Sequence, residues 1–183
     1  FPLLKQYKYF AAFAIPTSWI NGNTKDAYEA YGQNSLMSWD QMREMQRSGL
    51  VEFVSHSDNM HKGILANPQQ SMQPAAITRQ FLPKYQRYES DQAYQNRVVE
   101  DLQQSKKILD TELGIDTRAI FWPYGAVTKE SEELAEKAPG KPDADFLICV
   151  AEAAREVAAA KRPVVIVGGG VISAGASREV QAD

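Results

Sequence analysis

The stretch Leu50-Val-Glu-Phe-Val-Ser-His-Ser-Asp-Asn-Met-His-Lys-Gly63 joins a short apolar run to both histidines of the 183-residue chain. The apolar run predicts a short, mostly buried strand, and His56 follows it at or just past its carboxyl end. Ligand sets commonly lie at the carboxyl ends of strands in α/β folds. The stretch therefore predicts an α/β fold with a functional site at a strand end.

The spacing of His56 and His61 requires a loop between them. On one helix, residues five apart point about 140° away from each other, so the two imidazoles could not face one ion. Ser57, Asp58 and Asn59 favour turns through side-chain bonds to the backbone, and such a turn brings the second histidine back toward the first. Neutral imidazole nitrogens suit divalent transition metals, zinc first, with nickel, cobalt or iron after it. The pair predicts a metal site; the alternative is two unrelated polar loop residues.

A second segment, Arg118-Ala-Ile-Phe-Trp-Pro-Tyr-Gly125, begins as an apolar strand and breaks at Pro123 and Gly125. Trp122 and Tyr124 are therefore expected at the carboxyl end of another strand. Taken alone, the segment favours an ordinary strand-to-loop corner with core aromatic side chains. Taken with the histidine stretch, it indicates two strand ends that carry polar and aromatic groups together.

On these two segments, residues 1–138 resemble the polysaccharide deacetylase family, and within it the bacterial poly-β-1,6-N-acetylglucosamine N-deacetylases. In this family a His-Ser/Thr element followed by a second His supplies two metal ligands, and His56 and His61 match that element. The resemblance implies a metal-dependent N-deacetylase, an amidohydrolase that acts on N-acetylglucosamine polysaccharide.

The resemblance also implies roles for the second segment. Arg118 is expected to orient the catalytic aspartate, and Trp122 is expected to line the sugar site. Pro123 and Gly125 belong to the Trp-Pro-Tyr-Gly element that forms the wall of the substrate groove. The backbone N–H of Tyr124 is expected to help hold the oxyanion.

Part of the family's machinery has no counterpart in this sequence. The family's first motif, Thr-Phe-Asp-Asp-Gly, supplies the general base and the third metal ligand, and it precedes a segment like Phe1-Pro-Leu-Leu-Lys-Gln-Tyr7. The 183 residues contain no adjacent Asp-Asp pair and no third histidine to act as general acid. Asp58 is the one nearby carboxylate that could replace the missing ligand, although its side chain more simply caps the turn. We therefore expect an N-terminally truncated domain with impaired hydrolysis; the alternative is an inactive carbohydrate-binding or purely structural α/β domain.

The composition changes after residue 138. Ala138-Pro-Gly-Lys-Pro-Asp143 is typical of a linker, and the residues beyond it are rich in Ala and Val. A helix over 151–160, a buried strand over 164–167 and a turn over 168–170 are expected there. This helix-strand-helix segment resembles a fragment of the central domain of thiamine-diphosphate enzymes such as glyoxylate carboligase and trihydroxycyclohexanedione hydrolase. We expect a chimeric chain whose Rossmann-like residues 139–183 either dock on the first domain or stay separate from it.

Length and composition fit an ordinary globular protein. With a net charge of −3 and 44% hydrophobic residues, the chain can bury one core, and no strongly basic patch argues for nucleic acid. Cys149 is the single cysteine, so no disulfide forms within the chain. The sequence has no signal peptide and no apolar run long enough for a membrane span. Because the resembled deacetylases are exported, we expect a periplasmic or extracellular location and an N-acetylglucosamine polysaccharide as partner.

Strands and helices are expected to alternate along the chain. The pattern predicts strands over 9–15, 50–55 and 119–121, and Ser38-Trp-Asp-Gln41 forms a capping box for a helix that ends at Gly49. A longer helix over 91–113 has one apolar face and a glycine stop. Residues 64–90 lack clean periodicity and indicate an insertion over the groove, where Tyr85 and Tyr88 either stack on sugars or pack on the surface. The expected fold is α/β, an incomplete (β/α) barrel or open parallel sheet.

Overall fold

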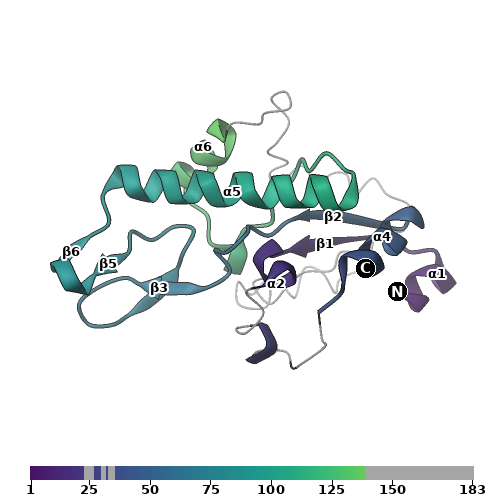
Figure 1. Ribbon diagram of the computed structural model, residues 1–183, viewed down its shortest axis with the longest axis horizontal. Helices are drawn as coiled ribbons and strands as arrows, with labels where there is room; N and C mark the ends of the chain where they lie inside the picture. Colours follow the sequence, from purple (N-terminus) through teal and green to yellow (C-terminus); the bar gives the residue numbers. More distant parts are fainter. Residues whose placement is uncertain (23–26, 30–31, 33–35, 139–183) are drawn as a thin grey trace, which may run out of the picture.

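The computed structural model describes residues 1–22, 27–29, 32 and 36–138 (Figure 1). The elements, in chain order, are α1 (Pro2–Tyr7), β1 (Ala11–Ile15), α2 (Thr17–Asn21), α4 (Trp39–Arg47), β2 (Val51–Ser55), β3 (Gly63–Leu65), β4 (Met72–Pro74), β5 (Phe81–Leu82), η1 (Pro83–Tyr85), β6 (Arg87–Tyr88), α5 (Asp91–Leu113), η2 (Pro123–Gly125) and α6 (Lys129–Lys137). The expected linker and the helix-strand-helix segment of residues 139–183 lie outside the described residues.

The sheet that leads to the histidines is parallel. β1 and β2 pair in register, from residue 11 opposite residue 51 to residue 15 opposite residue 55. Ser55 also forms a parallel bridge with Ile120, so a third segment lies beside β2 in the same direction. The expected α/β class and open parallel sheet are confirmed, and the described residues form no closed barrel. The strand expected over 119–121 is reduced to this bridge, since the chain enters the η2 turn at Pro123.

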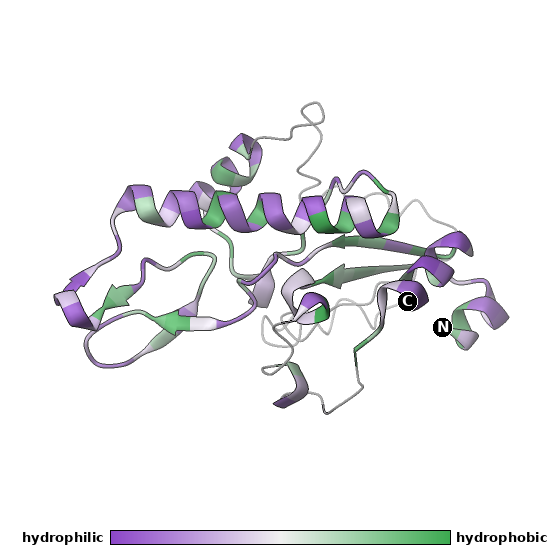
Figure 2. Cartoon of the chain, in the orientation of Figure 1, coloured by the Kyte–Doolittle hydropathy of each residue, from purple (hydrophilic) through white to green (hydrophobic). Residues whose placement is uncertain are grey.

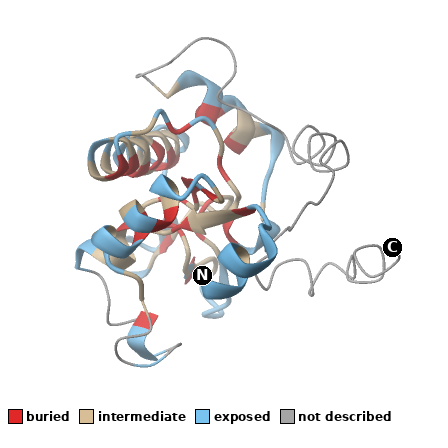
Figure 3. Cartoon of the chain, turned by 90° about the vertical axis from the view of Figure 1, so that its right-hand side faces the viewer, coloured by how far each residue is buried: buried red, intermediate tan, exposed pale blue. Residues whose placement is uncertain are grey.

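The long helix α5 has the apolar face that the sequence predicts. Its buried side chains include Tyr94, Val98, Leu102, Leu109 and Leu113. The helix ends at a glycine, residue 114, in left-handed conformation with φ 64°. In Figure 1, α5 runs along the sheet, and Figure 3 shows its buried residues on one side of the helix. The helix expected over 91–113 is therefore confirmed, including both of its ends.

A capping box starts α4, as the sequence predicts. The Ser38 hydroxyl accepts the N–H of Gln41, and the Gln41 side chain accepts the N–H of Ser38. The helix ends at Arg47, slightly before the expected Gly49. Its two buried methionines pack in a hydrophobic cluster with side chains of β1, β2 and the last turns of α5. Figure 2 shows apolar residues along β1 and β2.

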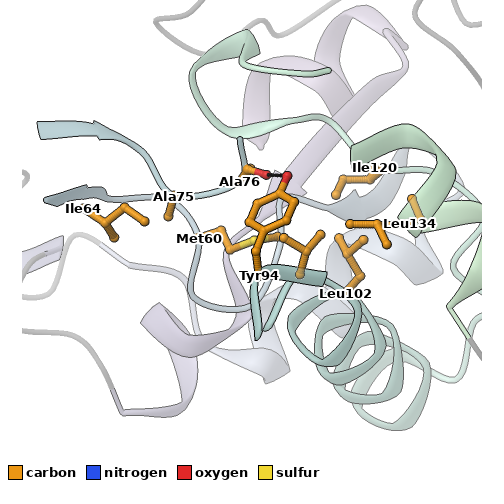
Figure 4. Packing of buried hydrophobic residues seen from close by; sticks show 10 residues of the cluster. Met60, Ile64, Ala75, Ala76, Tyr94, Leu102, Ile120 and Leu134 are labelled. Atoms are coloured by element: carbon orange, nitrogen blue, oxygen red, sulfur yellow. Dashed lines mark hydrogen bonds between the residues drawn. The ribbon is translucent and has the colours of Figure 1, made fainter. Parts of the chain in front are cut away.

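Residues 63–88 form two antiparallel hairpins that the sequence did not indicate. β3 pairs with β4, and β5 pairs with β6. The first hairpin is anchored on α5, because Ile64, Ala75 and Ala76 belong to a hydrophobic cluster with Tyr94 (Figure 4). The Tyr94 hydroxyl donates to the Ala76 carbonyl at 2.9 Å. Strands of two or three residues are too short to show a period of two, which explains the missing sequence pattern.

The two tyrosines of the second hairpin lie on the surface. The side chains of Tyr85 and Tyr88 are 57% and 51% exposed. The Tyr88 ring meets Phe81 at a steep angle, with centroids 5.4 Å apart. Sugar stacking by these residues therefore stays a prediction beside surface packing.

A guanidinium ties the second hairpin to α5. Arg97 donates from Nε and Nη2 to the two carboxylate oxygens of Glu89, at 2.9 and 2.8 Å. Arg97 also donates to the carbonyls of Ala75 and Thr78. Burial opposes ionisation of Glu89, but the hydrogen bonds from Arg97 hold the pKa of this carboxyl below its usual value. One side chain thus fixes three points of the chain between residues 75 and 89.

Replacing Arg97 by lysine is expected to lower the free energy of unfolding by about 2 kcal/mol. An ammonium group cannot keep a bidentate carboxylate pair together with two carbonyl bonds. Arg87→Lys is the matched control, because Arg87 is an exposed arginine of the same hairpin, and its expected change is below about 0.5 kcal/mol. Urea denaturation at pH 7 measures both variants. Equal unfolding midpoints for the two would contradict the role assigned to Arg97.

Candidate functional site

His56 directly follows β2, and neighbouring parallel segments fix both its backbone and its ring. Its N–H donates to the Ile15 carbonyl of β1 at 3.1 Å. Its Nδ1 donates to the Phe121 carbonyl at 2.5 Å, which leaves Nε2 as the ring nitrogen with a lone pair. Burial, together with the nearby His61, lowers the pKa of His56 to about 4. The imidazole is therefore neutral at pH 7 and has one nitrogen suited to a metal ion.

His61 lies in a compact cluster of rings. Its ring centroid is 4.8 Å from that of His56, so the loop brings the two histidines together. Tyr124 stacks on the His61 ring at 4.6 Å and 22°, and Trp19 meets it edge-on at 4.9 Å and 90°. Burial also lowers the pKa of His61. Four rings that follow three parallel segments thus meet at one edge of the sheet.

Trp19 belongs to this ring cluster, and the sequence pattern does not single it out. It belongs to α2, which begins two residues after β1 ends. The sequence signal for Trp19 is the strand expected over 9–15. Because the carboxyl ends of neighbouring parallel strands share one edge of the sheet, the residues that follow this strand should lie near the histidines. The residues just past Ile15 are therefore expected at the same edge of the sheet as those just past Ser55.

The loop between the histidines is held by α2. The N–H groups of Thr17 and Ser18 donate to the carbonyls of Ser57 and Asp58, each at 3.2 Å. The Thr17 hydroxyl donates to the Asp58 carboxylate at 2.6 Å, and the Ser18 hydroxyl donates to the Asp58 carbonyl at 2.6 Å. These contacts support a structural role for Asp58 in the loop over its use as a third metal ligand.

His56 and His61 could supply two donors to a metal ion, and the described residues contain no third side chain that completes a metal-binding group. Among these residues, no group of three His, Cys, Asp or Glu side chains could hold a metal ion. The pair itself fits a divalent transition metal, since both rings have lowered pKa values and one ring is oriented by a carbonyl. The described residues therefore offer at most part of a metal-binding site.

The Trp-Pro-Tyr-Gly element turns sharply at the site. Tyr124 and Gly125 both have left-handed backbone, with φ 60° and 63°. Because Tyr124 is not glycine, this conformation has to be imposed by its surroundings. Pro123 is buried, and the partly buried Trp122 packs against the hydrophobic cluster of Figure 4. Of the four residues, Tyr124 is the one whose ring contacts a histidine.

Arg118 has a different environment from the ring cluster. Its side chain is 63% exposed. Its Nε donates to the Asp116 carboxylate at 3.1 Å. The structure thus brings together His56, His61 and Tyr124, and it places Arg118 in an exposed ion pair.

The model of the polysaccharide deacetylase family matches residues 1–141. The poly-β-1,6-N-acetyl-D-glucosamine N-deacetylase of Escherichia coli K12 is 32% identical over 129 residues, which are 68% of this chain and 19% of that protein. A protein of the same name from Staphylococcus aureus MRSA252 is 25% identical over 138 residues, which are 75% of this chain and 39% of that protein. This chain therefore spans less than half the length of these curated relatives.

Two solved structures show the same similarity in three dimensions. The deacetylase domain of BpsB from Bordetella bronchiseptica has a TM-score of 0.66 and 40% identity, over 75% of this chain and 54% of that one. A de-N-acetylase from Aggregatibacter actinomycetemcomitans has a TM-score of 0.66 and 36% identity, over 75% of this chain and 53% of that one. The described fold therefore corresponds to about half of each neighbour.

Proposed function

Because the chain belongs to the polysaccharide deacetylase family, we propose that it takes part in the metal-dependent removal of acetyl groups from poly-β-1,6-N-acetyl-D-glucosamine. The observation that carries the proposal is the pair of imidazoles, 4.8 Å apart at the edge of a parallel sheet. The substrate class is supported by the relatives that are named for this reaction.

His56 and His61 are the proposed metal ligands, for zinc first and for nickel, cobalt or iron next. Nε2 of His56 is the expected donor, because Nδ1 is bonded to the Phe121 carbonyl. A bound divalent ion would polarise the acetamide carbonyl and activate a water molecule. Tyr124 is proposed to help hold the oxyanion through its backbone N–H, and the stacking of its ring on His61 supports this assignment.

Aromatic rings are the proposed sugar-binding surface. Trp19 and Tyr124 both contact His61, so a sugar bound over them would lie beside the imidazoles. Trp122, Pro123 and Gly125 are the proposed groove wall, by family resemblance. The role of Arg118 in orienting a catalytic aspartate stays a prediction.

A second candidate function is carbohydrate binding without turnover. It is favoured by the described residues, among which no group of three side chains could hold a metal ion. The proposed metal-dependent hydrolysis of an acetamide needs a base as well as a metal. The aromatic surface could bind polymer without either group.

The 183-residue chain, supplied with zinc or nickel, is expected to release acetate from a β-1,6-linked N-acetylglucosamine oligomer at least about 100-fold more slowly than a complete family member. A general base contributes roughly 10²–10⁴-fold, and the sequence offers no Asp-Asp motif to supply it. Acetate release with and without a chelator measures the rate.

The results of this assay, together with oligomer binding, distinguish the two candidate functions. Metal-dependent release at family-like rates would show that another residue acts as base, with Asp58→Asn as the first variant to test. Oligomer binding without any release would support the second candidate, and a chain that neither binds nor cleaves the oligomer would contradict both.

We also propose a periplasmic or extracellular site of action, because the relatives are named as deacetylases of poly-β-1,6-N-acetyl-D-glucosamine and the family resemblance implies an exported protein. Within the described ranges, no helix is long and apolar enough to span a bilayer.

A further inference from the structure

The helix α5 presents two polar residues to the histidine loop. Asp101 and Ser105 are four residues apart in α5, so they lie on the same side of the helix. One carboxylate oxygen of Asp101 accepts the N–H of Asp58, and the other accepts the N–H of Asn59, both at 2.8 Å. These two N–H groups lie in the middle of the loop that joins the histidines.

Ser105 fixes the start of the same loop. Its hydroxyl bonds the Ser55 hydroxyl at 2.8 Å, and Ser55 Oγ accepts the N–H of Ser57 at 3.0 Å. Ser57 Oγ then accepts the N–H of Met60 at 3.1 Å. Ser57 has left-handed backbone, φ 70°, which a non-glycine residue adopts when its surroundings impose it. All three serines are buried, so water does not compete for these bonds.

The two helices hold opposite sides of the loop backbone. α2 donates to the loop carbonyls through Thr17 and Ser18, whereas α5 accepts from the loop N–H groups through Asp101. A carboxylate suits this position because it accepts only and has two oxygens for two adjacent donors. Burial raises the pKa of Asp101 to about 6, which leaves the carboxyl mainly ionised at pH 7.

We propose that Asp101, assisted by Ser105, is a positioning residue that sets the distance between the imidazoles of His56 and His61. This positioning role rests on the proposed function, because a divalent ion needs two ligand nitrogens at a fixed distance. Asp101 acts through the loop backbone and not through either ring. The sequence alone shows Asp101 only as a polar residue next to the buried face of a helix.

The test of this proposal is Asp101→Asn in the full chain. The amide keeps the shape of the side chain but turns one acceptor into a donor, so one loop N–H faces another donor. We expect the affinity for zinc and nickel, measured by calorimetric titration, to fall about tenfold or more, as it does when groups that orient metal ligands are removed. In the metal-free chain, NMR should show faster exchange of the Asp58 and Asn59 amides. The nuclear Overhauser effect between the His61 and Tyr124 rings should weaken.

The matched control is Glu100→Gln, which removes the same charge from the neighbouring, exposed position of α5 and should leave every readout unchanged. If Asp101→Asn does not fold, Ser105→Ala serves as the second variant and should change the same readouts by a smaller factor. A folded Asp101→Asn with unchanged affinity and unchanged ring contact would overturn the inference. If the unsubstituted chain binds neither metal, the metal part of the proposed function fails, and the ring contact in the variant still decides the positioning role.

Discussion

The His61→Ala variant is expected to lose affinity for zinc and nickel by more than about 100-fold. Removing a group that merely orients a metal ligand lowers the metal affinity about 10–100-fold, so removing a ligand itself should lower it by more. His61 supplies one of two imidazoles whose ring centroids lie 4.8 Å apart. Within the described residues no third side chain completes a metal-binding group that could compensate for the loss. His56→Ala should show a loss of similar size.

Lys62→Ala is the matched control for this variant, because it truncates the next side chain without removing a ring nitrogen. Calorimetric titration of metal-stripped chains compares the three proteins under one condition. Equal affinities of His61→Ala and the unsubstituted chain would exclude His61 from the metal site. A loss shared by Lys62→Ala would point to damage of the loop instead of loss of a ligand.

The largest loss of stability is expected for Tyr94→Ala, about 3–5 kcal/mol in the free energy of unfolding. Tyr94 is fully buried in the cluster of Figure 4. The guanidinium groups of Arg79 and Arg97 lie 4.5 and 5.6 Å from its ring centroid. Alanine removes the ring that both cations contact and leaves the Ala76 carbonyl without its hydroxyl donor.

The Tyr94→Phe variant distinguishes the contribution of the ring to stability from that of the hydroxyl. It keeps the packing and removes one hydrogen bond, so a loss of about 1 kcal/mol is expected. Urea unfolding at pH 7, followed by circular dichroism, measures both variants. If Tyr94→Ala cost no more than Tyr94→Phe, ring packing would not be what anchors the first hairpin on α5.

The elements that the sequence predicts are those with local signals. The helix α5 has a regular apolar face, a glycine at its end and no proline within it, so its bounds follow from neighbouring residues alone. The capping box at Ser38 and Gln41 is equally local. The hairpins over 63–88 depend instead on pairing between very short strands and on contacts with α5. Neither produces a periodic pattern in the local sequence.

The same holds for the candidate site: the sequence predicts its local features but not its long-range contacts. The spacing of His56 and His61 excludes a shared helix face, and this local argument leads to the ring pair that the structure contains. The side chains around the pair depend on which strands are neighbours, and periodicity does not determine that order. Trp19 and Asp101 reach the loop from α2 and α5. The strand expected over 9–15 indicates only the region in which Trp19 lies, and no local signal indicates the contact of Asp101.

The ring cluster also links metal binding to the folding of the chain. Trp19, His61 and Tyr124 come from distant parts of the sequence, so their contacts close long loops and carry a high entropic cost. A short peptide that contains both histidines would lack the sheet that holds them together. A metal ion that binds the pair would therefore bind the native chain in preference to the unfolded chain and raise its melting temperature by mass action. Metal occupancy would report, in one measurement, whether the three parallel segments have assembled.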